Sequence, residues 1–124
     1  MSAKNKGTVE KVNKAFAENS VEGWLEFCSD DVVWTIVGAK SVKGKEAIRA
    51  WMASMDIEPP KFTVASLIAE GDNVVAHGNM IMKEKDGKST PYAYCDVYQF
   101  RNGKIVELLS FVVKTEARQE AKTA

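Results

Sequence analysis

The chain has 124 residues, its 17 lysines and arginines balance 17 aspartates and glutamates, and 45% of its residues are hydrophobic. Neither half carries excess positive charge, so the basic surface that nucleic-acid binding needs is absent. With no bilayer-length apolar run and no secretory signal core, we expect one cytoplasmic domain over residues 1–115 that binds no membrane, followed by a frayed tail over residues 116–124.

The first half of the chain predicts three helices and one strand. Apolar residues recur at helical spacing in a first helix and in a second helix that Ser20 caps and that runs to Cys28. The β-branched and aromatic segment 32–37 predicts a strand, and residues 38–44 are expected to form a polar loop. A third helix should end near Pro60. The apolar residues of these helices are Val9, Val12, Phe16, Val21, Trp24, Leu25, Ala47, Ile48, Trp51, Met52 and Met55.

The second half of the chain predicts strands separated by tight turns. The expected strands cover residues 61–69, 73–84, 90–100 and 104–115, with turns at 71–72, 86–87 and 102–103. Helices followed by antiparallel strands indicate an α+β fold in which the helices cover one face of a single curved sheet. The outer face is then either exposed to solvent or used for a symmetric dimer.

Cysteine and histidine are too few to indicate a disulfide framework or a metal site. Cys28 and Cys95 belong to a chain that can form its own core, which favours two free and mostly buried thiols. His77 is the single histidine, so the usual zinc-ligand groupings cannot form. We therefore expect no metal and no cofactor.

Alternation along the strand over residues 90–100 places a carboxylate in a column of aromatic side chains. That column consists of Tyr92, Tyr94, Asp96, Tyr98 and Phe100. If it faces the helices, burial should raise the pKa of Asp96 unless a charge or several donors keep it ionised. A turn centred near Lys88 would set Met80 beside Asp96, to within about one residue, so the residues alone leave open which face of the preceding strand meets Asp96.

Four short segments of the chain resemble motifs of one protein superfamily. Their order is typical of the SnoaL-like and ketosteroid-isomerase-like branch of the nuclear-transport-factor-2-like superfamily. The resemblance implies a cone-shaped α+β barrel, with three helices from the N-terminal half packed in a strongly curved, mainly antiparallel sheet. It also implies a deep apolar pocket and, usually, a homodimer through the outer sheet face. The segments are Asp30-Asp31-Val32-Val33-Trp34, Gly44-Lys45-Glu46-Ala47-Ile48, Ala69-Glu70-Gly71-Asp72-Asn73-Val74-Val75 and Phe100-Arg101-Asn102-Gly103-Lys104-Ile105.

The resemblance also implies roles for individual residues. Asp96 falls where the isomerase keeps the protonated aspartic acid of its oxyanion hole, and the same count turns His77 toward the pocket. The isomerase's general base falls around Thr35 and Ile36, and its tyrosine falls near Val12. The aspartate of the SnoaL-type cyclases falls near Val113. None of these last positions carries an acid–base group.

Asp96 and His77 are therefore the candidate catalytic residues, because histidine readily exchanges a proton near neutral pH. In each case the alternative is a buried side chain with a purely structural role. The candidate ligand-binding residues are Trp34, Ile36, Trp51, Met52, Asn79, Ile81, Tyr94, Tyr98, Leu108, Ser110 and Val112. A basic cluster of Lys40, Lys43 and Lys45 near the pocket rim is interpreted as a solvated loop.

Two functions from different classes remain open. The first is a pocket protein for a compact apolar, aromatic or carbonyl-bearing small molecule, as a cofactor-free isomerase, cyclase or hydrolase. The second is a non-catalytic module for ligand binding, dimerisation or protein interaction. A core closed by Trp34, Trp51 and Tyr98 would contradict the first function, whereas an open cavity would favour it.

Overall fold

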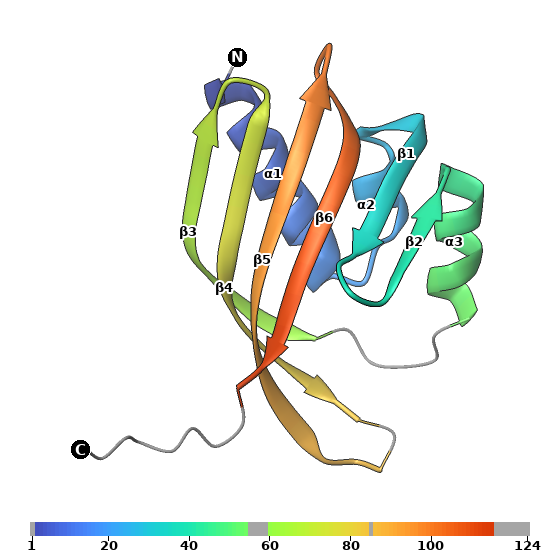
Figure 1. Ribbon diagram of the computed structural model, residues 1–124, viewed down its shortest axis with the longest axis vertical. Coiled ribbons are helices and arrows are strands. Elements are labelled where there is room, and N and C mark those ends of the chain that lie inside the picture. Colours follow the sequence, from blue (N-terminus) through green and yellow to red (C-terminus); the bar gives the residue numbers. More distant parts are fainter. Residues whose placement is uncertain (1, 55–59, 85, 116–124) are drawn as a thin grey trace.

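The computed structural model of the protein describes residues 2–54, 60–84 and 86–115 (Figure 1). This part of the chain forms three helices and one six-stranded sheet, which confirms the α+β fold. The elements are α1 (Ser2–Ala17), α2 (Glu22–Leu25), β1 (Cys28–Ile36), β2 (Lys40–Lys43), α3 (Lys45–Ser54), β3 (Lys61–Glu70), β4 (Asn73–Lys83), β5 (Ser89–Arg101) and β6 (Lys104–Lys114).

The sheet has the strand order β2-β1-β6-β5-β4-β3 and is open, with β2 and β3 at its edges. The neighbouring strands are antiparallel except for β1 and β6, which run parallel. Register shifts in β1, β3 and β5 bend the sheet. The helices lie on one side of it, with α1 near β3 and β4 and with α3 beside β1 and β2 (Figure 1). This arrangement agrees with a cone.

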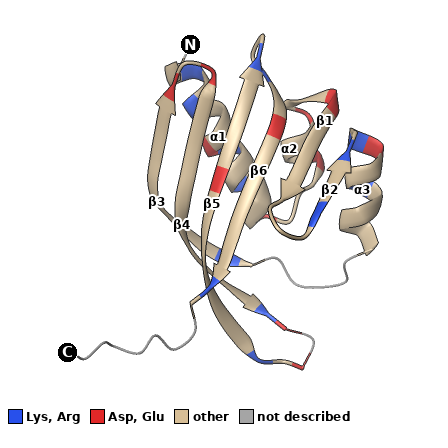
Figure 2. Ribbon diagram, viewed as in Figure 1, with Lys and Arg blue, Asp and Glu red and all other residues tan. Residues whose placement is uncertain are grey.

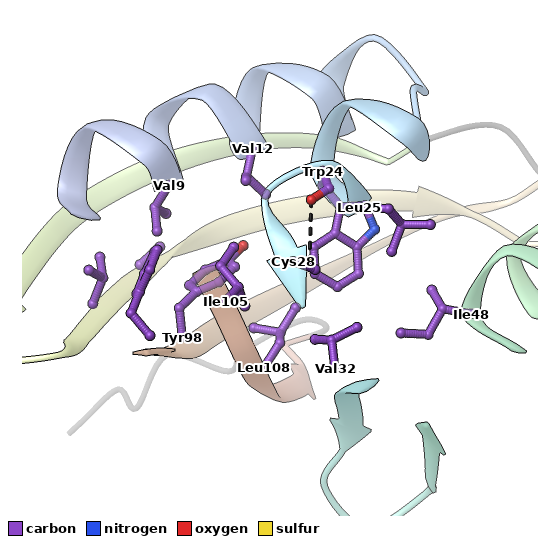
Figure 3. Close-up of a cluster of buried hydrophobic side chains, with 13 residues drawn as sticks. Val9, Val12, Trp24, Leu25, Cys28, Val32, Ile48, Tyr98, Ile105 and Leu108 are labelled. Carbon is purple, nitrogen blue, oxygen red and sulfur yellow. Dashed lines mark hydrogen bonds between the residues drawn. The ribbon is translucent and has the colours of Figure 1, made fainter. Parts of the chain in front are cut away.

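Figure 3 shows the core between the helices and the sheet, where apolar side chains from both layers meet. Val9 and Val12 of α1 are fully buried, as their helical spacing predicted. Trp24 of α2 and Tyr98 of β5 are the largest fully buried side chains of the described residues. Because apolar burial provides most of the driving force for folding, this cluster fixes how α1 and α2 sit on the sheet.

Charged residues avoid this core. Figure 2 shows them mainly on the helices, in turns and near strand ends. Within the strands, β4 carries a single charged residue, at its last position, Lys83. In contrast, β5 carries Asp96 in its middle. No described helix is both long enough and apolar enough to cross a membrane.

Two of the predicted elements differ from the observed ones. The second helix ends at Leu25, and Cys28 begins β1, so the strand starts four residues before Val32. Residues 40–43, expected to form a loop, form β2 instead. Polar residues are tolerated there because β2 is an edge strand that directs only alternate side chains toward the helices. The predicted end of the third helix, including Met55, and the tail over 116–124 lie outside the described residues.

Where β3 bends at its register shift, it passes close to Gly78 of β4. A Cβ atom on Gly78 would lie 2.0 Å from the carbonyl oxygen of Thr63 and 3.0 Å from the amide nitrogen of Ala65. Both neighbours are backbone atoms, so they cannot move aside as a flexible side chain can. The bend therefore requires glycine at this position.

We predict that Gly78→Ala lowers the free energy of unfolding by about 3 kcal/mol, because the added methyl group forces β3 away from β4. Urea unfolding followed by tryptophan fluorescence measures this change. Gly7→Ala is the control, because a Cβ atom there meets nothing within 4 Å and the residue lies inside α1. It should stabilise the protein by about 1 kcal/mol or less. Equal effects of the two substitutions would contradict the steric argument.

Candidate functional site

The register between β4 and β5 decides which residues share a face with Asp96. Ala76 pairs with Asp96, His77 pairs with Cys95, and Gly78 pairs with Tyr94, without a register shift along the ladder. Residues that face each other across a ladder point to the same side of the sheet, so His77 lies on the opposite face from Asp96. The prediction that Asp96 and His77 form a pair is therefore wrong.

The same register corrects two further expectations. Asn79 and Ile81 share the outer face with His77 and do not face the helices. Met80 pairs with Tyr92 rather than lying beside Asp96, because the hairpin turns around Asp86 and not Lys88. His77 could share a face with Asp96 only if odd-numbered residues of β4 paired with even-numbered residues of β5. The uninterrupted ladder instead pairs even-numbered residues with even-numbered ones and odd with odd.

The helix-side face gathers most of the other predicted ligand-binding residues. Asp96 pairs with Ser110, Tyr98 pairs with Leu108, and Trp34 of β1 pairs with Leu108 from the other side. Met52 of α3 packs against the core that these strands form. The predicted residues on this face of the sheet are Trp34, Ile36, Tyr94, Tyr98, Leu108, Ser110 and Val112.

A directed chain of hydrogen bonds links Trp34 to Asp96. The indole Nε1–H of Trp34 donates to the hydroxyl oxygen of Ser110 over 3.0 Å. An indole N–H can only donate, so the single hydroxyl proton of Ser110 stays free for another acceptor. Ser110 pairs with Asp96 across the β5–β6 ladder, and its hydroxyl lowers the pKa of the Asp96 carboxyl group, which assigns that carboxyl group as the acceptor. Asp96 is thus the acceptor at the end of the chain.

Burial and this hydrogen bond act on the pKa of Asp96 in opposite directions. Burial disfavours the charged carboxylate and raises the pKa, while the hydroxyl of Ser110 stabilises the carboxylate and lowers it. The result is a pKa raised to about 6 from an ordinary value of 3.8. At pH 7 the ionised form of Asp96 therefore predominates, and the carboxyl group takes up a proton in mildly acidic solution.

Aromatic side chains form a wall next to this chain. The ring centroids of Trp34 and Trp51 lie 5.0 Å apart, and those of Trp34 and Trp24 lie 5.7 Å apart, both in edge-to-face contacts. Trp24 is fully buried, whereas Trp34 and Trp51 remain partly exposed. Trp34 and Trp51 therefore offer accessible apolar surface, and the Trp34 indole is hydrogen-bonded to Ser110, which pairs with Asp96.

Arg49 ties α3, which carries Trp51, to α2. Its guanidinium group donates through Nε and Nη2 to the carboxylate of Glu22, and through Nη1 to Glu46 over 2.8 Å. Two-point contact of a guanidinium with a carboxylate fixes orientation as well as distance. The position of Trp51 against Trp34 is set partly by this network.

The two predicted tyrosines differ in what their hydroxyl groups do. The hydroxyl of Tyr94 donates to the carbonyl oxygen of Thr63 over 2.9 Å, and its ring meets Phe62 edge-to-face. Tyr98 is fully buried, and its hydroxyl finds no hydrogen-bond partner within the described residues. Burial raises the pKa of Tyr98, and the negative charge of Asp96 raises it further. Tyr94 thus supports the bend of β3, and Tyr98 belongs to the core.

His77 lies instead in a groove on the outer face of the sheet, with a volume of about 430 Å³. The residues that line it come from β3, β4, β5 and β6, and its surface is mainly apolar. The lining residues are Ala65, His77, Gly78, Asn79, Ala93, Tyr94, Cys95, Phe111 and Val113.

Both cysteines are free, as their number and context predicted. Cys28 is buried, and burial raises the pKa of its thiol to about 12, which leaves the thiol protonated and unreactive. Cys95 is on the outer face beside His77. Among the described residues, no three His, Cys, Asp or Glu side chains gather in a way that could hold a metal ion.

The sequence profile of the SnoaL-like domain matches residues 9–108, which is most of the chain. The chain belongs to the SnoaL-like domain family. No curated protein matches the sequence significantly.

Solved structures with the same fold cover nearly the whole of this SnoaL-like domain. A putative SnoaL-like polyketide cyclase from Jannaschia sp. CCS1 is 17% identical with a TM-score of 0.81, over 90% of this chain and 87% of the other. An NTF2-like protein of unknown function from Burkholderia pseudomallei is 23% identical with a TM-score of 0.80, over 89% and 90%. A putative ketosteroid isomerase from Kribbella flavida is 12% identical with a TM-score of 0.79, over 99% and 93%. The TM-scores show a shared fold, and at sequence identities this low the comparisons show the fold alone.

The positions at which the family resemblance placed other acid–base groups are occupied differently in this SnoaL-like domain. The hydroxyl of Thr35 shares a 2.6 Å hydrogen bond with the hydroxyl of Ser41. Val12 is fully buried in the core, and Val113 is 62% exposed on the outer face. Asp96 is the acidic residue that the domain places on the helix-side face of β5.

Sequence reasoning singled out Trp34, Ser110 and Asp96 separately but missed that they form one chain. Trp34 and Ser110 are 76 residues apart, and their contact depends on the parallel pairing of β1 with β6. A local pattern carries no signal for such a contact. The alternation of β6 alone does indicate that Ser110 faces the helices.

We predict that Asp96→Asn stabilises the protein at pH 7 by about 2 kcal/mol and has little effect near pH 4. The folded chain binds the Asp96 proton more tightly, with a pKa of about 6 against an ordinary value of 3.8. Between about pH 4 and pH 6 the folded state therefore holds more protons, so the Asp96 contribution to the free energy of unfolding falls as the pH rises. Asparagine cannot ionise and removes this loss.

Urea unfolding across this pH range measures the difference between the variant and the wild-type protein. Asp72→Asn is the matched control, because Asp72 is exposed in the turn between β3 and β4. A variant that is less stable than the wild type at both ends of the range would show that the carboxylate is mainly structural.

Proposed function

We propose that this SnoaL-like domain binds a compact, largely apolar small molecule on the helix-side face of the sheet, with ionised Asp96 accepting a hydrogen bond or a proton from it. The observation that carries the proposal is the directed chain from Trp34 through Ser110 to Asp96. Because this chain delivers a proton donor to Asp96, it favours the acceptor state of the carboxylate. This role differs from the neutral acid that the family resemblance implies.

The surroundings of Asp96 support binding of a flat, apolar ligand. Trp34 and Trp51 present partly exposed indoles, and apolar walls with a few placed polar groups are typical of small-molecule sites. Tyr94 and Val112 flank Asp96 and Ser110 on the same face, because Tyr94 pairs with Val112. A ligand ring against the indoles would bring its polar substituent toward Asp96.

The same arrangement would suit acid–base catalysis. A general base works best when its pKa lies near the operating pH, and Asp96 has a pKa of about 6. A ligand with a C–H bond next to a carbonyl group would lose that proton to the Asp96 carboxylate and regain it at another carbon atom. Isomerase-like or cyclase-like proton transfer is therefore the catalytic form of this proposal.

Two naphthalenes that differ in one donor test the acceptor role. 2-Naphthol carries an O–H group, and 2-methoxynaphthalene has the same ring without it. At pH 8 we expect the wild-type protein to bind 2-naphthol about tenfold more tightly, which is the usual benefit of a hydrogen bond to a charged group. The preference should shrink below pH 6, as Asp96 becomes protonated. Isothermal titration calorimetry measures both affinities.

Two substitutions test whether Asp96 causes the preference for 2-naphthol over 2-methoxynaphthalene. Asp96→Ala should abolish it, and Asp72→Asn, in an exposed turn, should retain it. Equal binding of the two naphthalenes by the wild-type protein at pH 8 would rule out the acceptor role. Failure of both to bind at millimolar concentration would rule out ligand binding on the helix-side face.

The second candidate function is association of two copies through the outer sheet face. Large apolar side chains that are normally covered are exposed there, and such patches usually mark interfaces. Two of them, Phe111 and Val113, line the groove that contains His77. The exposed residues are Ile68 at 57%, Ile81 at 50%, Phe111 at 41% and Val113 at 62%. A homodimer would bury them.

We predict that Phe111→Glu converts a homodimer to a monomer, because each copy would then bury an unpaired charge in the interface. Sedimentation velocity measures the association state. Val112→Glu is the matched control, since Val112 is the next residue of β6, is similarly exposed at 37% and faces the helices. A wild-type protein that sediments as a monomer at micromolar concentration would contradict the proposed association.

A further inference from the structure

The structure separates the three lysines of the basic cluster. Lys43 pairs with Val33 and Lys40 pairs with Ile36. The hydroxyls of Thr35 and Ser41 meet on the outer side, so Lys40 and Ile36, one residue along each strand, face the helices. Lys43 therefore lies on the outer face. The third, Lys45, lies 3.7 Å from the carboxylate of Asp30.

Lys40 is held beside the aromatic wall. Its Nζ lies 5.1 Å from the centre of a Trp51 ring, and the ring of Trp51 meets that of Trp34. An ammonium group over an indole face is attracted by the electron-rich ring, which gives this exposed side chain a preferred position. In the part of the chain that the structure describes, no carboxylate pairs with Lys40.

The two ends of the wall therefore carry opposite charges. Lys40 provides a positive charge at the Trp51 end, and the Trp34 end leads through Ser110 to the Asp96 carboxylate. A ligand anion would be attracted to the first end and repelled by the second. Charge alone would fix which way round such a ligand lies.

We propose that the ligand is an aromatic organic anion, whose carboxylate or sulfonate group pairs with Lys40 while its ring lies along Trp51 and Trp34. This inference rests on the proposed function, because it takes the hydrogen-bond donor of the ligand to lie at Asp96. It adds the substrate class and names Lys40 as the residue that selects it. An apolar ring with an anionic group at one end and a hydroxyl group at the other meets both requirements.

The probe is 6-hydroxy-2-naphthoate, which adds a carboxylate to 2-naphthol at the end of the ring system away from the hydroxyl group. Calorimetry at pH 8 and low ionic strength compares the two compounds. We expect the wild-type protein to bind the naphthoate about fivefold more tightly, as is typical of one solvent-exposed ion pair. The preference should fall at about 0.5 M salt, since salt screens exposed charges.

Lys40→Met keeps most of the apolar length of the side chain and removes the charge. It should abolish the preference for the naphthoate over 2-naphthol. Lys43→Met, on the same strand but the opposite face, is the matched control and should retain the preference. A preference that survives in Lys40→Met, or that both variants lose equally, would overturn the role of Lys40.

The result also separates this inference from the proposed function. If 2-naphthol binds and depends on Asp96 but the wild-type protein does not favour the naphthoate, only the anion selectivity is wrong. If neither compound binds, the proposed function and the anion selectivity both fail.

Discussion

Side-chain alternation in a paired sheet is the constraint on which the site depends. Each strand residue has one face, and an uninterrupted ladder passes that assignment to the next strand. The pairing of Ala76 with Asp96, and of Asp96 with Ser110, places residues of three strands on the helix side together. The parallel pairing of β1 with β6 then brings Trp34 to the same face. A shift by one residue in any of these ladders would move the side chains of one strand to the opposite face and so separate the residues of the site.

Within that face, the direction of one hydrogen bond sets the chemistry. The indole of Trp34 occupies the acceptor side of the Ser110 hydroxyl, so the hydroxyl must donate elsewhere. Without this donor, burial alone would raise the pKa of Asp96 further and favour the neutral acid. The difference between an acceptor and a donor at Asp96 thus lies in a side chain from a different strand.

Local patterns in the sequence were sufficient for most of the fold. Helical spacing in α1 and the turn residues between the later strands follow from neighbouring residues. The edge strand β2 was missed because its residues are polar and it is short, so only its pairing with β1 distinguishes it from a loop. Family resemblance identified the fold, but the ungapped count based on it turned His77 toward the helices, and the observed β4–β5 register places His77 on the outer face.

The position of Asp96 on its strand could be derived from alternation, but its electrostatics could not. Its pKa depends on a hydroxyl from β6 and an indole from β1, which no pattern along β5 contains. The role of Lys40 was hidden for the same reason. Lys40 and Lys43 can be told apart only when residues 40–43 are recognised as a strand. Side chains three positions apart on a strand then point to opposite faces.

Alternation also keeps the two proposed activities independent. On β5, Asp96 faces the proposed ligand site and its neighbour Cys95 faces the proposed interface, while Ser110 and Phe111 point to these same two faces from β6. A second copy on the outer face would cover Cys95 and Phe111 without contacting the carboxyl group of Asp96. Because Asp96 and Phe111 point to opposite faces, a substitution of either residue can disrupt one proposed activity and leave the other side chain in place.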